Sequence, residues 1–207
     1  MRALNNVSGH IDRGEIVAIS GSSGAGKTTL LNILGLSDHR YHGDLFFEDK
    51  SMPKDPASAI KLRRHSIGYI SGGNGLLPML SVLENVAYPL SMNGYSKKQR
   101  TEMAVAILSS IGMETMQKLK PMQLTDEERL AVGIAKSMVH RPKLVIGDEL
   151  TTGLASPAAY SVIEMLLYLA QQQNITLVLA TQDPRLTHYC DYAIELHMGE
   201  KMAERRF

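Results

Sequence analysis

Four apolar segments along the chain have the length and composition of buried β-strands. Each is a short run rich in Val, Ile and Leu that ends in glycine or polar residues. The four segments span residues 15–21, 66–71, 143–149 and 175–182. Continuous apolar runs, in place of alternating apolar and polar positions, are typical of strands covered on both faces of a parallel sheet.

The stretches between these runs have the apolar spacing of helices. We expect helices over residues 27–36, 81–94, 97–111, 124–140 and 157–173, the second of them broken near Pro89. We also expect a short strand at residues 44–49, a turn-rich stretch at 51–60 and a hairpin at 192–203. Strands that alternate with helices predict an α/β fold with a mostly parallel sheet.

The domain organisation follows from the length of the chain and from where the helices concentrate. A chain of 207 residues suits one domain, so residues 1–207 are expected to share one core. The stretch from about 80 to 140 is nearly all helical, which predicts a helical subdomain inserted into the sheet domain.

Composition and charge argue against several classes of protein. The 22 Lys and Arg residues nearly balance the 21 Asp and Glu residues, which gives no support for nucleic-acid binding. The one cysteine, Cys190, rules out an intramolecular disulfide and is typical of a reducing compartment. We find neither a signal-peptide pattern nor an apolar run of the roughly 20 residues needed to cross a bilayer. We therefore expect a soluble protein that could dock on a membrane protein.

A glycine-rich loop follows the first predicted strand. Residues 21–28 read GSSGAGKT, which matches G-x-x-x-x-G-K-[ST] between a strand and a helix. Glycines let backbone N–H groups surround a phosphate, Lys27 would reach the β- and γ-phosphates, and the Thr28 hydroxyl would ligate Mg²⁺. The predicted nucleotide-binding residues are Gly21, Ser22, Ser23, Gly24, Ala25, Gly26, Lys27, Thr28 and Thr29. The alternative is a glycine-rich turn between core elements.

Two adjacent carboxylates end the third apolar run. Asp148 would hold Mg²⁺ through water, and Glu149 would polarise the attacking water. An apolar strand that ends in Asp-Glu is common in purely structural settings. Together with the phosphate loop, however, the pair indicates a nucleotide-hydrolysing site.

The helix expected at residues 124–140 has a strongly capped start. Thr125 can act as N-cap, and Glu128, three residues later, completes a capping box. Asp126 and Glu127 add negative charge to the first turn, where the helix dipole favours it. A bare helix N-terminus attracts anions, whereas this one carries three carboxylates.

Taken in order, these motifs resemble those of the ATPase subunit of ABC transporters. The resemblance covers residues 3–36, 67–100, 121–156 and 176–186, and it is similar to the branch of lipoprotein-releasing and MacB-type efflux ATPases. It implies a P-loop NTPase fold of the ABC ATPase type, in which a helical subdomain is inserted into a mostly parallel sheet. A phosphate loop alone would indicate only an NTPase, so the ordered set is the more specific signal.

The resemblance also implies cofactors, partners and a location. Members bind ATP and Mg²⁺ and work as dimers, with each ATP between the phosphate loop of one subunit and the signature helix of the other. They dock on an integral-membrane permease at the cytoplasmic face of the inner membrane. The branch similarity favours export, or translocation of a lipoprotein, peptide or drug, and the dimer could be a homodimer or a heterodimer.

The sequence departs from the family at the signature. The family reads L-S-G-G-[EQ], where this chain has Leu124, Thr125, Asp126, Glu127 and Glu128. The glycines of the family open the backbone toward the γ-phosphate of the other subunit. Asp126 and Glu127 replace that open backbone with bulk and negative charge.

Further departures surround the same phosphate. Gly72 stands where the family has its loop glutamine, Ala155 replaces the D-loop aspartate, and Leu150 replaces the proline after the catalytic glutamate. Gln182, the second candidate catalytic residue beside Glu149, occupies the position of the switch histidine. It could hydrogen-bond a phosphate oxygen there but could not carry the charge of an imidazolium. No aromatic residue aligns with the one that the family stacks on adenine.

These observations leave three functions open. The first is an ABC transporter ATPase that hydrolyses Mg-ATP, slowly or with help from its permease and partners. The second is a degenerate subunit that binds nucleotide and serves as a regulatory or structural partner. The third is an unrelated P-loop NTPase, or an ABC protein without a transporter. The transporter interpretation also predicts a docking site for the permease near residues 72–85, at the apolar residues Leu76, Leu77, Met79 and Leu80. The alternative is that these four residues cap the core.

Overall fold

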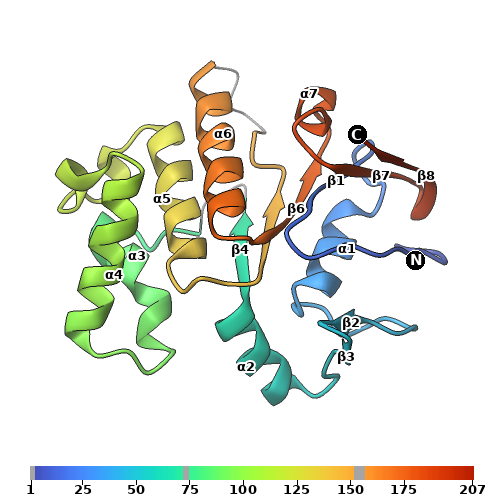
Figure 1. The fold of residues 1–207 in the computed structure, drawn as a ribbon, viewed down its shortest axis with the longest axis horizontal. Helices are drawn as coiled ribbons and strands as arrows, with labels where there is room; N and C mark the ends of the chain where they lie inside the picture. The colour runs from blue at the N-terminus through green and yellow to red at the C-terminus, as the bar shows by residue number, and fades with distance from the viewer. Residues whose placement is uncertain (1–2, 72–74, 152–156) are drawn as a thin grey trace.

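A six-stranded sheet forms the centre of the molecule (Figure 1). The computed structural model describes residues 3–71, 75–151 and 157–207. The strand order is β4-β5-β6-β1-β7-β8; the first five strands are parallel, and β8 pairs antiparallel with β7. The strands are β1 (Ile16–Ser20), β4 (Ile67–Ser71), β5 (Leu144–Asp148), β6 (Thr176–Thr181), β7 (Tyr192–His197) and β8 (Glu200–Arg206). The expected α/β fold with a mostly parallel sheet is confirmed.

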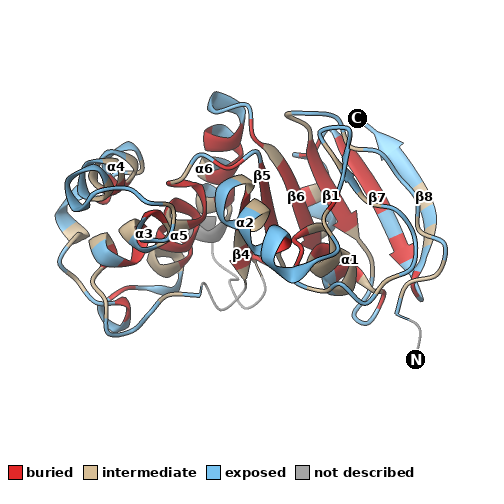
Figure 2. Cartoon of the chain, turned by 90° about the horizontal axis from the view of Figure 1, so that it is seen from below, coloured by how far each residue is buried: buried red, intermediate tan, exposed pale blue. Residues whose placement is uncertain are grey.

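Helices cover both faces of the sheet, which explains why its strands are apolar throughout. Ile16 and Ala18 of β1 pack with side chains of α5, α6 and α7, whereas Val17 and Ile19 pack with side chains of α1 and α2. The helices are α1 (Lys27–Leu34), α2 (Pro56–Ser66), α5 (Asp126–Met138), α6 (Pro157–Gln172) and α7 (Pro184–Thr187). Figure 2 shows buried residues concentrated along the central strands. A small hairpin, β2 (Phe46–Phe47) with β3 (Lys50–Ser51), lies on the α1 side.

Three helices, α3 (Val82–Ser91), α4 (Lys97–Ser110) and α5, pack together around a second apolar cluster. Val82, Val86 and Leu90 of α3 meet Ala104 and Leu108 of α4 inside it. Two short 3₁₀ turns, η1 (Glu114–Met116) and η2 (Pro121–Gln123), connect α4 to α5. This group lies at one end of the molecule in Figure 1 and occupies the stretch expected to be helical. We propose that it is the inserted subdomain.

Two expectations about local structure are wrong. The stretch at 51–60 is not turn-rich to its end, because α2 begins at Pro56, where Asp55 caps the helix by accepting from the Ser58 N–H at 2.8 Å. Helix α3 does not break near Pro89 but continues to Ser91. Proline removes one helical hydrogen bond, and buried Val86 and Leu90 keep the last turn packed against its neighbours. Within the described ranges, no helix is long and apolar enough to cross a membrane.

The strand register brings three loops to one edge of the sheet. Ser20, at the end of β1, lies beside Thr181, at the end of β6. Asp148, at the end of β5, lies beside Ala180 of β6. The segments that follow β1, β5 and β6 therefore start side by side at the carboxyl edge, where open α/β sheets bind their ligands.

Candidate nucleotide site

The loop after β1 depends on glycine for its path. Gly21 has φ +148°, and a Cβ atom there would lie 2.3 Å from the Leu196 carbonyl oxygen. Gly26 has φ +103°, and its Cβ would lie 2.8 Å from the Ala3 carbonyl oxygen. Side chains at these two positions would require the loop to move, so the glycine spacing that predicted a phosphate loop is also needed for its shape.

Helix α1 begins without a side-chain cap. Its N-cap residue is Gly26, no side chain accepts from its first turn, and that turn contains no acidic residue. The first N–H groups of a helix lack acceptors within the helix and carry the positive end of its dipole. The start of α1 therefore presents an electropositive backbone to whatever the loop encloses, as an anion site requires.

Lys27 is nearly completely buried beneath this loop, with 5% of its side chain exposed. Its Nζ atom donates to the carbonyl oxygens of Gly21 (2.7 Å) and Ser22 (3.0 Å). It also lies 3.1 Å from Oε1 of Glu149, which neutralises the buried charge. An ammonium group has three donors, so this set of partners uses all of them.

Thr28 and Asp148 supply a pair of oxygen atoms that fits magnesium. The Thr28 hydroxyl donates to Oδ1 of Asp148 at 3.3 Å, which joins the start of α1 to the end of β5. No group of three or more His, Cys, Asp or Glu residues suited to a metal occurs in the described part of the chain. Mg²⁺ is commonly held by one or two protein oxygens, with water and phosphate completing its shell, so one hydroxyl and one carboxylate fit it.

Glu149 and Gln182, the predicted catalytic pair, lie in direct contact. The Gln182 side-chain amide donates to Oε1 of Glu149 at 3.1 Å, and its backbone N–H lies 3.3 Å from Oε2. The backbone of Glu149 has φ +50° and donates to the Ala180 carbonyl at 3.0 Å. The strands β5 and β6 therefore place a carboxylate between a buried cation and an amide.

A cluster beside Gln182 was not anticipated from the sequence. The Tyr160 hydroxyl of α6 donates to Asp183, and the Arg185 guanidinium both pairs with Asp183 and lies 4.6 Å from the centre of the Tyr160 ring. The hydrogen bonds from Arg185, helped by that from Tyr160, hold the pKa of the Asp183 carboxyl well below its usual range. The sequence Gln-Asp-Pro predicts a turn after the strand, but no local pattern predicts that Asp183 contacts Tyr160, which lies 23 positions earlier.

The signature turn has the predicted cap. The Thr125 hydroxyl accepts from the Glu128 N–H at 3.2 Å, and the Glu128 carboxylate accepts from the Thr125 N–H at 2.8 Å. Asp126 pairs with Arg129, which also donates to the carbonyl of Leu124. Helices α5 and α1 stand well apart in Figure 1, so the fold of one chain does not bring this turn to the phosphate loop.

Three further departures from the family motifs are at Leu150, Gly72 and Ala155. Leu150 is buried beside Gly147, where it packs in the core. Gly72 and Ala155, the positions of the loop glutamine and the D-loop aspartate, lie outside the described residues.

The predicted docking residues are held by one buried amide. The Asn85 side chain accepts from the Leu77 N–H at 2.7 Å and donates to the Leu80 carbonyl at 3.1 Å. Met79 and Leu77 are 83% and 37% exposed, whereas Leu76 and Leu80 are partly buried. The expected exposed apolar cluster is therefore reduced to Leu77 and Met79.

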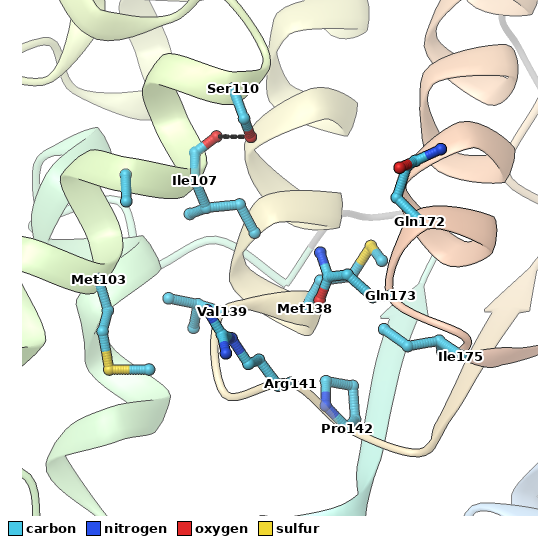
Figure 3. Close-up of a pocket in the computed structure, with 11 residues that line it drawn as sticks. Met103, Ile107, Ser110, Met138, Val139, Arg141, Pro142, Gln172, Gln173 and Ile175 are labelled. Atoms are coloured by element: carbon cyan, nitrogen blue, oxygen red, sulfur yellow. Dashed lines mark hydrogen bonds between the residues drawn. The ribbon is translucent and has the colours of Figure 1, made fainter.

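A groove of about 520 Å³ lies at the other edge of the sheet (Figure 3). It is bordered by α4, by the segment between α5 and β5, and by the segment between α6 and β6. Its lining residues are Met103, Ala106, Ile107, Ser110, Met138, Val139, Arg141, Pro142, Gln172, Gln173 and Ile175. None of the predicted site residues lines it, and it lies where β5 and β6 begin and not where they end.

Comparison with known proteins connects this geometry to one family. The profile of the family described as ABC transporter matches residues 4–152. An ATP-binding protein of Staphylococcus aureus (strain MRSA252), HrtA, named for hemin import, is 32% identical over 199 residues, which cover 96% of this chain and 90% of that protein.

Two solved structures are similar over almost the whole chain. One is the dimeric ATP-binding cassette MJ0796 bound to ADP and Pi, with a TM-score of 0.89 and 31% identity, covering 99% of this chain and 90% of that one. The other is CbiO1 of Clostridium perfringens, part of the transporter complex CbiONQ, with a TM-score of 0.90 and 26% identity, covering 99% of this chain and 82% of that one.

Proposed function

The chain belongs to the ABC transporter family of ATP-binding proteins, and from that premise we propose that it binds Mg-ATP and hydrolyses it to drive a membrane permease. ATP binding and ATPase activity are properties of this family. What we propose for this particular chain is the set of residues that do the work, the retention of turnover and the direction of transport.

The single observation that carries the proposal is the arrangement of the start of α1 against the end of β5. Lys27 is buried between the phosphate loop and Glu149, and Thr28 lies against Asp148. In the proposal, Lys27 and the N–H groups of residues 21–29 bind the phosphates, and Thr28 and Asp148 hold Mg²⁺. When bound, the metal would offset the negative charge of the phosphates. Glu149 would orient and polarise the attacking water. Its carboxylate accepts a hydrogen bond from Gln182, which follows β6.

The family also supplies the setting for this site. ABC cassettes dimerise and work with membrane permeases, and the relatives include a dimeric cassette and a member of a transporter complex. We propose that this chain forms such a dimer, with itself or with a second ATPase. We place it at the cytoplasmic face of the membrane through a permease that contacts Leu77 and Met79.

Direction and substrate form the most specific part of the proposal. We propose export, or translocation of a lipoprotein, peptide or drug, on the similarity of the motifs to the efflux branch. The relative HrtA is named for import of hemin. Sealed vesicles that contain the permease complex separate the two directions, because ATP added outside inverted vesicles drives accumulation inside them only if the complex exports.

One observation favours a second function, that of a degenerate subunit that binds nucleotide without efficient closure. Asp126 and Glu127 stand on a fully capped turn where the family has glycines. In a closed dimer these carboxylates would face the γ-phosphate of the partner. A chain of this kind would pair with a competent ATPase and regulate it.

The deciding experiment measures ATP binding and phosphate release by the chain alone and in complex with its permease. If the proposed function is right, the chain binds ATP in both states and releases phosphate at least in the complex, and Glu149→Gln slows that release by about 10²-fold or more. Binding without turnover in the complex, unchanged by Glu149→Gln, would favour the regulatory function. The docking surface is tested with Leu77→Glu and Met79→Glu, which should weaken permease binding. Met202→Glu, at an exposed methionine on β8, is the matched control.

A further inference from the structure

We infer that a groove on the α1 side of the sheet binds an extended peptide strand of a partner protein, with apolar side chains at alternate positions and basic ones between them. The groove has a volume of about 950 Å³ and lies between residues 7–13 and strand β2. Among the described residues, none that lines it belongs to the candidate nucleotide site. It is therefore a separate surface, and strand binding there does not require that the chain hydrolyses ATP.

One wall of the groove is a stretch of backbone without hydrogen bonds. Val7 and Ile11 pack against the apolar cluster on the α1 side of the sheet, whereas Ser8 and His10 between them are exposed. This alternation is typical of a β-strand. In the described part of the chain, however, no N–H or C=O group of residues 7–11 has a hydrogen-bond partner. Because extended backbone normally pairs, these groups form an open edge to which a further strand can bond.

The facing wall is the outer edge of β2. The Met52 N–H donates to the Leu45 carbonyl at 2.7 Å, which makes this a hydrogen-bonded pair of the hairpin. Bonded and non-bonded pairs alternate along an antiparallel ladder, so the next pair, Phe46 with Ser51, is not bonded. The backbone N–H and C=O of Phe46 therefore point away from β3. Leu45, Phe46 and Phe47 line the groove, so this second open edge borders it as well.

The floor between the two walls is apolar. Ile19, Val178 and Ile194 of the sheet line it together with Leu30 and Leu34 of α1. In Figure 1 the N-terminal segment, drawn in blue, and the β2–β3 hairpin both lie beside α1. A β-strand presents alternate side chains to one face and its N–H and C=O groups to both edges. An apolar floor between two open backbone edges matches that arrangement and fits strand addition.

The charged residues around the groove favour a basic strand. Glu48 pairs with Lys143 at 2.6 Å, whereas Asp44 and Asp49 form no ion pair within the described ranges. Complementary charge across an interface speeds association and selects among partners. Lysine or arginine at the outward positions of the strand would supply it. Four acidic and two basic residues line the groove alongside His10: Asp12, Asp44, Glu48 and Asp49 against Arg13 and Lys143.

The test adds a synthetic peptide that alternates valine with lysine or threonine to the full chain, at a length of about eight residues, which is usual for a strand. Isothermal titration measures its Kd. A control peptide of the same sequence has its backbone nitrogens methylated at every second residue, which removes the donors of one edge. We expect this control to bind at least about tenfold more weakly. Replacing the lysines by glutamates should weaken binding by about threefold to tenfold at low salt.

Amide hydrogen exchange shows where the peptide binds. The amides of residues 7–11 have no partner in the described part of the chain, so they should exchange fast in the free protein. The unmodified peptide should slow exchange in this stretch and in residues 45–47, and the methylated control should not.

Proline variants test the wall formed by residues 7–11. Successive N–H groups of an extended segment point to opposite edges, so only one of Gly9 and His10 presents its donor to the groove. One of the variants Gly9→Pro and His10→Pro should therefore weaken peptide binding by about fivefold or more, and the other should not. Gly9→Ala and His10→Ala keep the N–H and are the matched controls. A Cβ atom at Gly9 would lie 3.8 Å from Cδ1 of Ile194, an ordinary contact. Thermal unfolding checks that each variant is folded.

Several results would overturn strand binding at this groove. They are the absence of peptide binding, equal binding of the methylated control, protection only elsewhere in the chain, and proline variants that both bind like the wild type. A dimer of the chain alone that excludes the peptide, and that one proline variant dissociates, would assign the groove to a second copy and would also overturn it. None of these measurements involves ATP turnover, so failure here leaves the proposed function untouched.

Discussion

The N-termini of α1 and α5 present the same backbone N–H groups but differ in the side chains around them. Helix α1 begins at a glycine with no side-chain cap and no acidic residue in its first turn. Helix α5 begins at Thr125, which forms a capping box with Glu128, and its first turn contains three carboxylates. Each start offers N–H groups without acceptors in the helix, and only α1 leaves them to an external anion.

Negative charge in the first turn of a helix stabilises the helix but opposes the binding of an anion at the same place. An N-cap side chain contributes about 1 kcal/mol to stability. One carboxylate about 5 Å from one phosphate charge, at an effective dielectric constant near 20, is unfavourable by roughly 3 kcal/mol before screening. The repulsion toward a partner's nucleotide is therefore larger than what the cap contributes to α5. The cap is formed by Thr125 and Glu128, so glycines at 126 and 127 would remove this repulsion and still leave the cap in place.

The largest expected effect is the loss of ATP binding on replacing Lys27, at the uncapped N-terminus of α1. Lys27→Ala removes the only cation described between the loop and Glu149, so the Kd for ATP should rise about 100-fold and turnover should fall to background. Isothermal titration with Mg-ATP and a phosphate-release assay measure the two effects. Lys143→Ala, which removes an exposed lysine paired with Glu48, should leave both unchanged. Retained ATP affinity in Lys27→Ala would show that α1 is not the phosphate site.

The next largest effect is expected at Glu149, whose carboxylate pairs with Lys27, the first residue of α1. Glu149→Gln keeps the shape of the side chain but cannot accept a proton, so kcat should fall by about 10²-fold or more. Mg-ATP affinity should be retained, because the phosphate contacts remain. Single-turnover hydrolysis and equilibrium binding give the two numbers. Equal turnover of the variant and the wild type would contradict a catalytic role.

The next expected effect is a gain of activity on removing the carboxylates from the first turn of α5. The double variant Asp126→Gly with Glu127→Gly should raise turnover of the dimer up to about tenfold, because it removes negative charge and opens the backbone. Each glycine in a helix should also lower stability by about 1 kcal/mol, as urea unfolding would measure.

A matched variant separates charge from bulk in that experiment. Asp126→Asn with Glu127→Gln keeps the side-chain volume and removes the charge, so it should give most of the gain if electrostatics dominates. Turnover that stays unchanged in both double variants would mean that the α5 start does not face nucleotide at all.

The sequence predicted the sheet well because its apolar strands leave few alternatives. The runs around β1, β5 and β6 were expected within a residue or two of their observed ends. Helix α2 was missed because Pro53, Asp55 and Pro56 read as a turn, whereas Asp55 and Pro56 cap and start a helix. Pro89 predicts a break, but α3 continues past it because Val86 and Leu90 pack against α4 and also against α5, which follows much later in the chain.

The site could be anticipated only where local motifs determine it. Lys27, Thr28, Asp148 and Glu149 belong to motifs at strand ends, and parallel strands bring those ends together. The contact of Gln182 with Glu149 needs the relative heights of β5 and β6, which depend on sheet register. The anchor from Tyr160 to Asp183 depends on how α6 packs on the sheet, and nothing local encodes that distance.

The smallest expected effect is the loss of stability on removing the Thr125 cap of α5. Thr125→Ala removes the hydroxyl that accepts from Glu128, so the free energy of unfolding should fall by about 1 kcal/mol. Ser96→Ala removes the equivalent hydroxyl from the capping box of α4 and should lower stability by a similar amount. Urea unfolding compares the two losses. If the cap of α5 also keeps N–H groups from a partner's nucleotide, only Thr125→Ala should change turnover in the permease complex. Equal turnover in the two variants, at equal loss of stability, would mean that this cap serves the helix alone and that the carboxylates of Asp126 and Glu127 oppose closure by themselves.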